Sequence, residues 1–200
     1  MLSWLSGGAE MESEKAKKLK EIEEKCLQCS KCGLCAGRHN VVFGVGNPES
    51  EVMFIGEGPG EQEDLKGEPF VGRAGQLLDK YLAAVDLDRR ENVYIANIIK
   101  CRPPQNRDPL PEEQDACIPW LREQFAVIRP KIVVCLGRIA AARIIKPDIR
   151  IKREHGVFFR KGGVLMMPVL HPAALLRNPA DKPGAFEDFL KLREQIDNMT

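Results

Sequence analysis

The sequence predicts a three-layer α/β/α fold with a central, mainly parallel four-stranded sheet. Two observations predict it: short apolar runs recur along the chain, and segments of helical periodicity separate them. Strands that alternate with helices need crossover connections, which make neighbouring strands parallel and place helices on both faces. The expected strands are residues 52–55, 93–98, 132–136 and 164–170, and the expected helices are residues 9–28, 75–85, 112–128, 137–145 and 185–197.

Each kind of element has its own signal. The strand segments are short and mostly apolar throughout, which is typical of strands buried on both faces of a parallel sheet. The first helix, residues 9–28, is charge-rich, and its Leu19, Ile22 and Leu27 are loosely at helical spacing, so most of its surface should face solvent. Pro119 lies inside the third helix, and we expect that helix to kink or split there.

The composition is that of a soluble globular protein, with 44% hydrophobic and 30% charged residues. The net charge is +1, so any contact with nucleic acid needs a local basic face rather than bulk charge. No apolar run approaches the roughly 20 residues that span a bilayer, and the N-terminal segment lacks the apolar stretch of a signal peptide. We expect a cytoplasmic protein without membrane contact, folded as a single domain over residues 1–200 with residues 1–25 as a helical N-terminal extension.

The segments that follow the predicted strands carry glycine and polar residues. Gly-Glu-Gly-Pro-Gly-Glu (56–61) follows the first strand, Asn97 lies within the second, the third runs into Gly137, and the fourth runs into His171. Ligands of open α/β sheets bind beyond the carboxyl ends of the strands, so these segments should converge on one pocket. The glycine loop fits neither common phosphate-binding signature and is acidic; it favours either close approach of a flat, neutral ligand or a purely structural turn.

Three side chains in these segments could contact such a ligand. The Asn97 carboxamide offers the acceptor and donors that discriminate a pyrimidine edge. Phe70, in a glycine-rich loop, could stack on a flat ring or plug the core. His171 opens the segment His-Pro-Ala-Ala-Leu-Leu-Arg, which suggests a leucine wedge beside a phosphate-binding arginine; the alternative is a helix start whose Leu175 and Leu176 belong to the core.

The cysteines predict a metal site. In a reducing compartment, clustered thiols indicate metal binding rather than disulfides. Four thiolates suit zinc or a [4Fe–4S] cluster, and the spacing leaves both metals and three N-terminal C-x2-C pairs open. Cys135, inside an apolar run, should be unliganded. The seven cysteines are Cys26, Cys29, Cys32 and Cys35 at every third position, with Cys101, Cys117 and Cys135 further along the chain.

Five segments together resemble the family 4 uracil-DNA glycosylases, the iron–sulfur-containing bacterial and archaeal branch of the uracil-DNA glycosylase superfamily. The joint match in order and spacing is more specific than any single motif, and it spans roughly residues 20 to 195. The segments are VVFGVGNP (41–48), GEGPGEQED (56–64), PFVGRAGQLLD (69–79), NIIKCRPPQNRDPLPEE (97–113) and HPAALLRNP (171–179).

The resemblance implies a [4Fe–4S] cluster of structural rather than catalytic purpose, which ties the N-terminal segment to the loop that faces DNA. Counting back from residues 41–44 reaches Cys32 as the family's second N-terminal ligand. Cys26 and Cys35 are then bystanders. The implied ligands are Cys29, Cys32, Cys101 and Cys117.

The resemblance also implies hydrolysis of the N-glycosidic bond of uracil in DNA, which releases free uracil and leaves an abasic site for base-excision repair. The uracil must leave the base stack to be reached. Which carboxylate of GEGPGEQED guides the attacking water stays open. The implied residues are His171, Glu57 and Glu63 for catalysis, Gly58, Asp64, Phe70 and Asn97 for uracil binding, and Leu175 and Arg177 for DNA binding.

Each of the main side chains has an expected role in that reaction. Asn97 should pair with the N3–H and O4 edge of uracil, and Phe70 should stack on its ring. His171 should stabilise the uracil anion that forms when the bond breaks. Leu175 should fill the space that the base leaves, and Arg177 should hold a backbone phosphate.

Two other functions compete with this reading: a non-catalytic, metal-stabilised nucleic-acid-binding module, and a zinc-stabilised hydrolase of free nucleotides. A relative that traps uracil covalently does so through a histidine in a basic insertion; residues 102–111 contain neither, so trapping is not expected. The expected partner is uracil-containing DNA, single- or double-stranded, and the expected state is a monomer. The sequence indicates nothing for or against contact with a sliding clamp.

Overall fold

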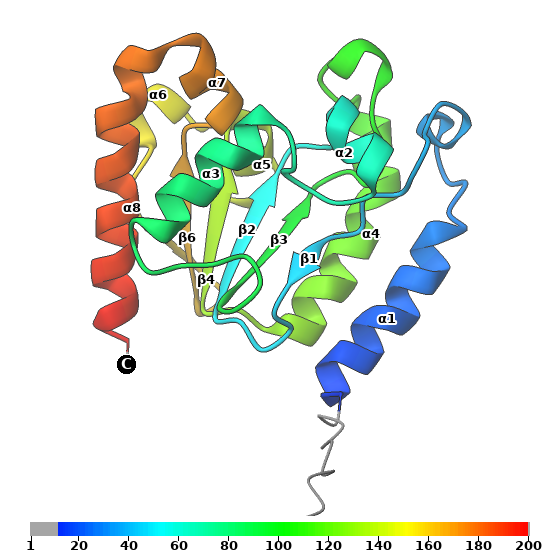
Figure 1. Ribbon diagram of the computed structural model, residues 1–200, viewed down its shortest axis with the longest axis horizontal. Helices are drawn as coiled ribbons and strands as arrows, with labels where there is room; N and C mark the ends of the chain where they lie inside the picture. Colours follow the sequence, from blue (N-terminus) through cyan, green and yellow to red (C-terminus); the bar gives the residue numbers. More distant parts are fainter. Residues whose placement is uncertain (1–11, 200) are drawn as a thin grey trace, which may run out of the picture.

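The computed structural model describes residues 12–199, which form three layers, with helices on both faces of one sheet (Figure 1). The sheet has the strand order β1-β3-β2-β4-β6-β5. Its four central strands are parallel, whereas β1 pairs antiparallel with β3 and β5 pairs antiparallel with β6. The strands are β1 (Val45–Gly46), β2 (Val52–Gly56), β3 (Val93–Asn97), β4 (Ile132–Leu136), β5 (Phe159–Lys161) and β6 (Val164–Val169).

The predicted α/β class is confirmed, but the sheet has six strands rather than four. The four central strands agree with the predicted runs to within one residue at each end. The two strands that the sequence did not predict lie at the edges and contain two and three residues. Segments this short cannot show the alternation that identifies a strand.

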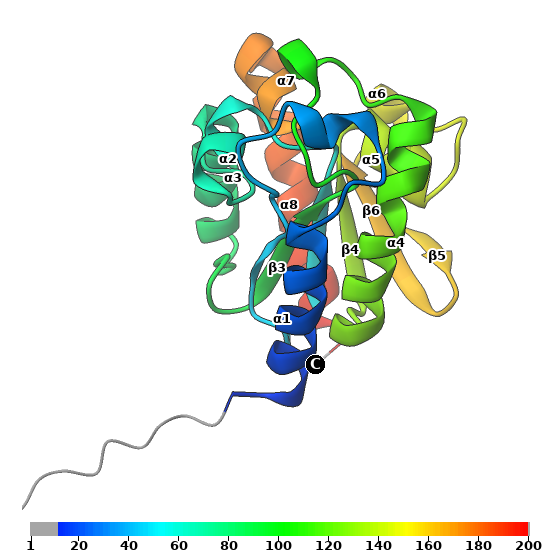
Figure 2. The same ribbon diagram turned by 90° about the vertical axis from the view of Figure 1, so that its right-hand side faces the viewer.

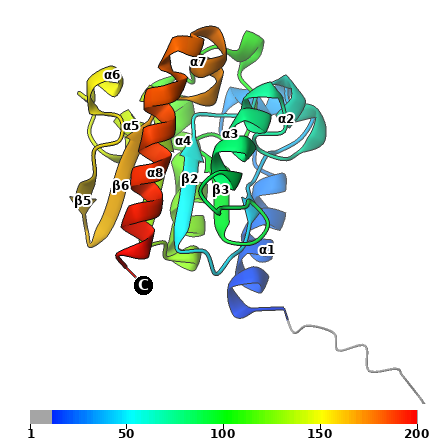
Figure 3. The same cartoon turned by 60° about the vertical axis from the view of Figure 1, so that its left-hand side comes forward.

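The long helices cover the two faces of the sheet. Figure 2 shows α1, α4 and α5 on one face, and Figure 3 shows α3 and α8 on the other. The helices are α1 (Glu14–Leu27), α2 (Glu61–Lys66), α3 (Arg73–Ala83), α4 (Pro111–Ile128), α5 (Arg138–Ile144), α6 (Ile151–Glu154), α7 (Pro172–Arg177) and α8 (Lys182–Asp197), with short 3-10 helices η1 (Gly33–Ala36), η2 (Pro104–Asn106) and η3 (Pro179–Asp181).

Strand β2 shows why the predicted strands are continuously apolar. Met53 and Ile55 pack into the cluster shared with α1, α4 and α5, whereas Val52 and Phe54 pack into the cluster shared with α3 and α8. Successive side chains of a strand point to opposite faces, and here both faces are covered. This sandwich holds the carboxyl ends of the central strands in fixed positions.

Helix α4 was expected to kink or split at Pro119, and the split is wrong. The helix runs unbroken from Pro111 to Ile128. A proline inside a helix costs about 3 kcal/mol, but full burial of one large apolar side chain is worth about 1.5–3 kcal/mol. The neighbours Ile118, Trp120 and Leu121 are all buried, so their packing outweighs the lost hydrogen bond.

Helix α1 lies against α4 and begins at Glu14 rather than at residue 9. The Ser13 hydroxyl caps it by accepting a hydrogen bond from the amide of Ala16 at 3.1 Å. Residues 9–11 of the predicted helix lie outside the described residues. Leu19 and Ile22 belong to the same apolar cluster as α4, so this part of the expected N-terminal extension is joined to the core. Within residues 12–199, no helix is long and apolar enough to cross a membrane.

Candidate active site and cysteine pocket

A cavity of about 500 Å³ opens at the carboxyl ends of the central strands. Its lining includes Glu57 and Gly58 after β2, Asn97 at the end of β3, Gly137 after β4 and His171 after β6. The four strand-end segments therefore converge on one pocket, as the sequence predicted. Phe70 reaches the same cavity from the turn between α2 and α3.

Asn97 is the buried polar group of this cavity. The residue is 1% exposed, and its Oδ1 forms no hydrogen bond with any described residue. Gly56, its register partner on β2, leaves the room that the carboxamide needs: a Cβ there would lie 2.4 Å from Asn97 Oδ1 and 2.6 Å from Phe70 Cζ. A buried acceptor without a partner is unfavourable unless a ligand supplies the donor.

Phe70 and His171 place two rings beside the same cavity. Their ring centroids are 5.7 Å apart and the planes are tilted by 34°. Phe70 is buried and has a φ of 55°, a conformation that bulky residues rarely adopt. Such backbone outliers concentrate at functional sites, where the surrounding structure holds them in place.

The hydrogen bonding of His171 fixes which ring nitrogen carries the proton. His171 is the N-cap of α7, and its Nδ1 accepts a hydrogen bond from the amide of Ala173 at 3.1 Å. The neutral ring therefore carries its proton on Nε2, which is left as the donor. Burial, helped by the charge of Arg177, lowers the pKa of His171 to about 4, so the ring is neutral at pH 7.

The two carboxylates predicted for catalysis have different surroundings. Burial, together with the charge of Asp108, raises the pKa of Glu57 to about 7, while Arg138 opposes this rise. Oε1 of Glu63 accepts hydrogen bonds from the amides of Val71 at 2.9 Å and Gly72 at 2.8 Å. Glu57 thus combines a perturbed pKa with a place on the cavity wall, whereas one oxygen of Glu63 is committed to the Phe70 turn.

The structure corrects the prediction that Asp64 binds uracil. Asp64 is buried outside the cavity lining, where Oδ1 accepts from the amide of His39 at 2.9 Å and Oδ2 lies 2.6 Å from His39 Nδ1. Neighbouring residues on a helix point about 100° apart, and on α2 it is Glu63 that lines the cavity while Asp64 points to His39. Gly58, by contrast, does line it; a Cβ there would lie 2.6 Å from Ile99 Cγ1.

The structure also contradicts the prediction of Leu175 as a wedge. Leu175 is 1% exposed and packs with Leu170 and Ala185, which agrees with the alternative of a helix whose leucine belongs to the core. Arg177, at the end of the same helix, is exposed and lines the cavity. Its position remains compatible with the predicted phosphate contact.

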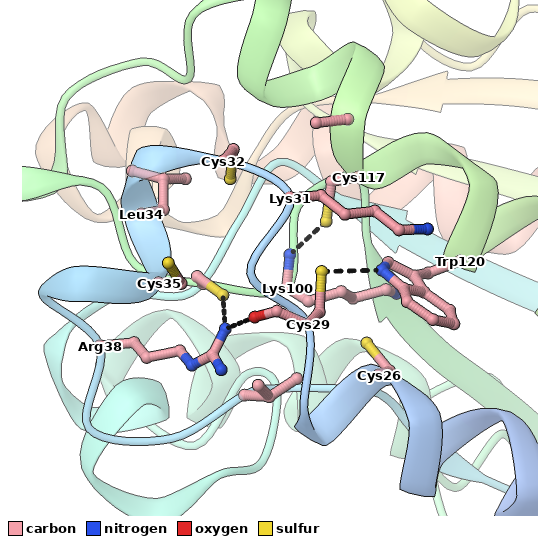
Figure 4. Close-up of a pocket in the computed structure, with 13 residues that line it drawn as sticks. Cys26, Cys29, Lys31, Cys32, Leu34, Cys35, Arg38, Lys100, Cys117 and Trp120 are labelled. Atoms are coloured by element: carbon pink, nitrogen blue, oxygen red, sulfur yellow. Dashed lines mark hydrogen bonds between the residues drawn. The ribbon is translucent and has the colours of Figure 1, made fainter.

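A second pocket gathers six of the seven cysteines. Cys101 comes from the segment after β3. Figure 4 shows Cys117 on α4 and the other four on α1 and the segment after it. The seventh, Cys135, is buried in β4, as predicted, and does not line this pocket. The lining cysteines are Cys26, Cys29, Cys32, Cys35, Cys101 and Cys117.

Hydrogen-bond donors reach three of the four sulfur atoms that the resemblance selects. Trp120 Nε1 donates to Cys29 Sγ at 3.4 Å. Arg38 Nη1 donates to Cys101 Sγ at 3.5 Å. The third donor, the amide of Lys100, lies 3.2 Å from Cys117 Sγ. Such donors stabilise thiolate sulfur, the form that binds metals. All six cysteines line one pocket, although within residues 12–199 no group of three or more His, Cys, Asp or Glu side chains is already arranged to hold a metal ion.

Lys100 links the two pockets, and sequence reasoning missed it. Its side chain is fully buried, and Nζ donates to the carbonyl oxygens of Phe43 at 2.9 Å and Asn97 at 3.0 Å, and to Gln124 Oε1 at 2.6 Å. One residue thus contacts the cysteine pocket through its amide and the backbone of Asn97 through its ammonium. A lysine directly after an apolar run was the signal available in the sequence.

These features define a small-ligand site at the carboxyl edge of an α/β sheet beside a buried thiol pocket, and comparison with known proteins assigns the family. Residues 43–193 match the model of the uracil DNA glycosylase superfamily. The chain belongs to this superfamily.

Several relatives lie in one branch of it. The chain is 46% identical over 186 residues to a Type-4 uracil-DNA glycosylase of Archaeoglobus fulgidus, which covers 89% of this chain and 93% of that protein. It is 44% identical over 164 residues to a Type-4 uracil-DNA glycosylase of Thermotoga maritima, with coverage of 80% and 84%. A Type-5 uracil-DNA glycosylase of Pyrobaculum aerophilum is 32% identical over 146 residues, with coverage of 65% and 64%.

Proposed function

We propose that the protein is a DNA-repair glycosylase that hydrolyses the N-glycosidic bond of uracil in DNA. The products are free uracil and an abasic site, which is the first step of base-excision repair. The observation that carries the proposal is the buried, unpartnered Oδ1 of Asn97 in a cavity that also holds the rings of Phe70 and His171. The family and the Type-4 relatives support the same reaction.

Asn97 and Phe70 are the side chains that recognise uracil. An extruded uracil presents N3–H as a donor and O4 as an acceptor, so N3–H supplies the donor that Asn97 Oδ1 lacks and the amide N–H bonds O4. Cytosine exchanges donor and acceptor on that edge, which mispairs a buried amide held in this orientation. The Phe70 ring stacks on the base, as aromatic side chains do with flat rings.

His171 assists bond cleavage by stabilising the uracil anion that leaves. As the bond between C1′ and N1 breaks, its electron pair moves onto uracil and charge develops on O2, while the sugar becomes an oxocarbenium ion. The neutral imidazole, with its proton on Nε2, stabilises that oxyanion as a preorganised donor and costs no reorganisation. Because the pKa of His171 is about 4, the ring acts as a hydrogen-bond donor and not as a cation at pH 7.

Water then attacks C1′, and we propose Glu57, whose carboxylate lines the cavity, as the residue that orients it. The water oxygen bonds to C1′, and its proton leaves to the carboxylate or to solvent. A carboxylate with a pKa near 7 is matched to this exchange at neutral pH. Glu63 contributes by binding the amides of the Phe70 turn.

DNA is held by local charge, since the net charge of the chain is only +1. Arg138, Lys152 and Arg177 are exposed and line the cavity, where they can contact the phosphates that flank an extruded nucleotide. We propose that the chain acts as a monomer and a single domain over residues 1–200 in the cytoplasm.

The donor chemistry of the cysteine pocket supports a [4Fe–4S] cluster as the bound group. Four thiolates are the usual ligand set of such a cluster, and donors to sulfur tune and stabilise it. The proposed ligands are Cys29, Cys32, Cys101 and Cys117, which join the segment after α1 to the segment after β3 and to α4. A cluster held there would cross-link these segments, and no step of the hydrolysis would pass through it.

Uracil excision tests the proposal. Purified protein is incubated with single- and double-stranded DNA that contains one uracil, and alkali then cleaves the abasic sites. We expect strand cleavage at uracil and none in matched DNA with cytosine. His171→Ala should lose most activity, whereas His39→Ala, at an exposed histidine outside the cavity, should keep it. DNA retention without base release, unchanged in His171→Ala, would instead indicate a non-catalytic binding module.

A further inference from the structure

The guanidinium of Arg89 is buried behind the turn that carries Phe70. Arg89 lies between α3 and β3 and is 9% exposed. Nη1 donates to the carbonyl oxygen of Pro69 at 2.9 Å, and Nη2 donates to that of Phe70 at 2.7 Å. Nε donates to Asp79 Oδ1 at 2.8 Å, which balances the charge. A charged residue this buried is rare unless it is paired and hydrogen-bonded, and the partners of Arg89 are the backbone of this turn and Asp79.

The Phe70 backbone needs such support. Its φ of 55° is strained for an aromatic residue and persists where the surroundings enforce it. Gly75 allows the conformation, because a Cβ at that position would lie 1.7 Å from the Phe70 carbonyl oxygen. Arg89 fixes the direction of that carbonyl group from the other side.

The next two peptides are held by an opposite charge. Oε1 of Glu63 accepts from the amides of Val71 and Gly72. A cation therefore binds the carbonyl groups at and before Phe70, and an anion binds the amides after it. The backbone is therefore hydrogen-bonded to a charged side chain on each side of Phe70, the residue whose ring lines the cavity.

We propose that Arg89 is a positioning residue for base recognition, which holds Phe70 in the left-handed conformation that points its ring into the cavity beside His171. This inference rests on the proposed function of that cavity as a uracil pocket. Arginine suits the role because its planar fork bonds two successive carbonyl groups while a third N–H meets Asp79. A lysine at this position keeps the charge and loses the fork.

Three variants test the inference by uracil excision under single-turnover conditions. Arg89→Met should lower kcat/KM about 10- to 100-fold, since misplacement of a binding group by about 1 Å has effects of that order. Arg89→Lys should fall between Arg89→Met and the wild type. Arg90→Met is the matched control: it changes the adjacent, exposed arginine and should leave kcat/KM unchanged.

A double-mutant cycle separates positioning from general stability. In a Phe70→Ala background there is no ring to position, so Arg89→Met should change kcat/KM by less than about twofold. The same loss in both backgrounds would overturn the inference, as would wild-type activity of Arg89→Met. Circular dichroism and thermal melts report folding; if Arg89→Met does not fold, Arg89→Lys takes its place in the cycle. If the wild-type protein releases no uracil, both the proposed function and this inference are overturned. If the wild-type protein excises uracil and the Arg89 variants do so equally well, this inference alone is overturned.

Discussion

Replacement of Asn97 by aspartate tests uracil recognition with the smallest change in shape. The substitution keeps an acceptor where Oδ1 stands and replaces the amide donor by a second acceptor. The ammonium of Lys100 binds the backbone carbonyl oxygen of Asn97 at 3.0 Å, a contact that the substitution leaves in place, and a thermal melt checks that the variant folds. Bound uracil would then direct O4 at a carboxylate oxygen in a site that is 1% exposed.

The magnitude follows from the burial of this residue. A lost neutral hydrogen bond is worth about 1 kcal/mol, and an acceptor left unsatisfied in a buried site costs about 1–3 kcal/mol more. The sum of about 2–4 kcal/mol corresponds to a loss of about 30- to 1000-fold in kcat/KM for uracil. Excision of cytosine should not fall in proportion, so discrimination between the two bases should weaken.

Single-turnover excision from duplexes with U·G or C·G at one position measures both quantities. Asn198→Asp, the same change at the exposed end of α8, is the control and should match the wild type. Uracil excision by Asn97→Asp within twofold of the wild type, with unchanged selectivity, would refute the pairing of Asn97 with the base.

Three further predictions concern the water, the α7 segment and the thiols. The pKa of Glu57 is raised to about 7, so the carboxylate that orients water is lost as the pH falls through 7; the wild-type rate should fall about tenfold per unit at lower pH, and Glu57→Gln should show a lower rate without that slope. Leu175→Ala should destabilise the fold by about 2–5 kcal/mol with little change in DNA affinity, whereas Arg177→Ala should weaken DNA binding with little change in stability. Calorimetry measures the stability and filter binding the affinity; weaker DNA binding by folded Leu175→Ala would support the wedge role that the structure argues against. Cys101→Ser should lower the iron content and the absorbance near about 400 nm, whereas Cys135→Ser should keep both per folded molecule; equal loss in both would contradict the proposed ligand set.

The strands could be predicted because burial on both faces leaves a signal in every residue. Runs such as residues 132–136 are apolar throughout, and the strand found there has the same bounds. The two edge strands and the helices α2 and α6 were missed because six residues or fewer do not complete two helical turns or a strand pattern. Pro119 does not split its helix, because the buried side chains around it stabilise the helix and a local pattern does not show that packing.

The site residues also separate into those that the sequence could predict and those that it could not. Asn97 and His171 lie at strand ends, and the topology of a parallel sheet brings such ends together, so their meeting followed from the strand predictions. Leu175 and Asp64 lie on short helices, where one residue of rotation decides between core and cavity. Arg89 and Lys100 act on backbone carbonyl groups that are remote in sequence or on the opposite side of a strand, and no local pattern marks such contacts.

A crystal structure with DNA that carries a hydrolysis-resistant uracil nucleotide tests the account most directly. The decisive measurement is the distance from uracil N3 to Asn97 Oδ1. We expect an extruded uracil with that distance at about 2.9 Å, its face on Phe70 and its O2 toward His171 Nε2. A uracil bound elsewhere, or one in the cavity with its N3 turned away from Asn97, would contradict the account.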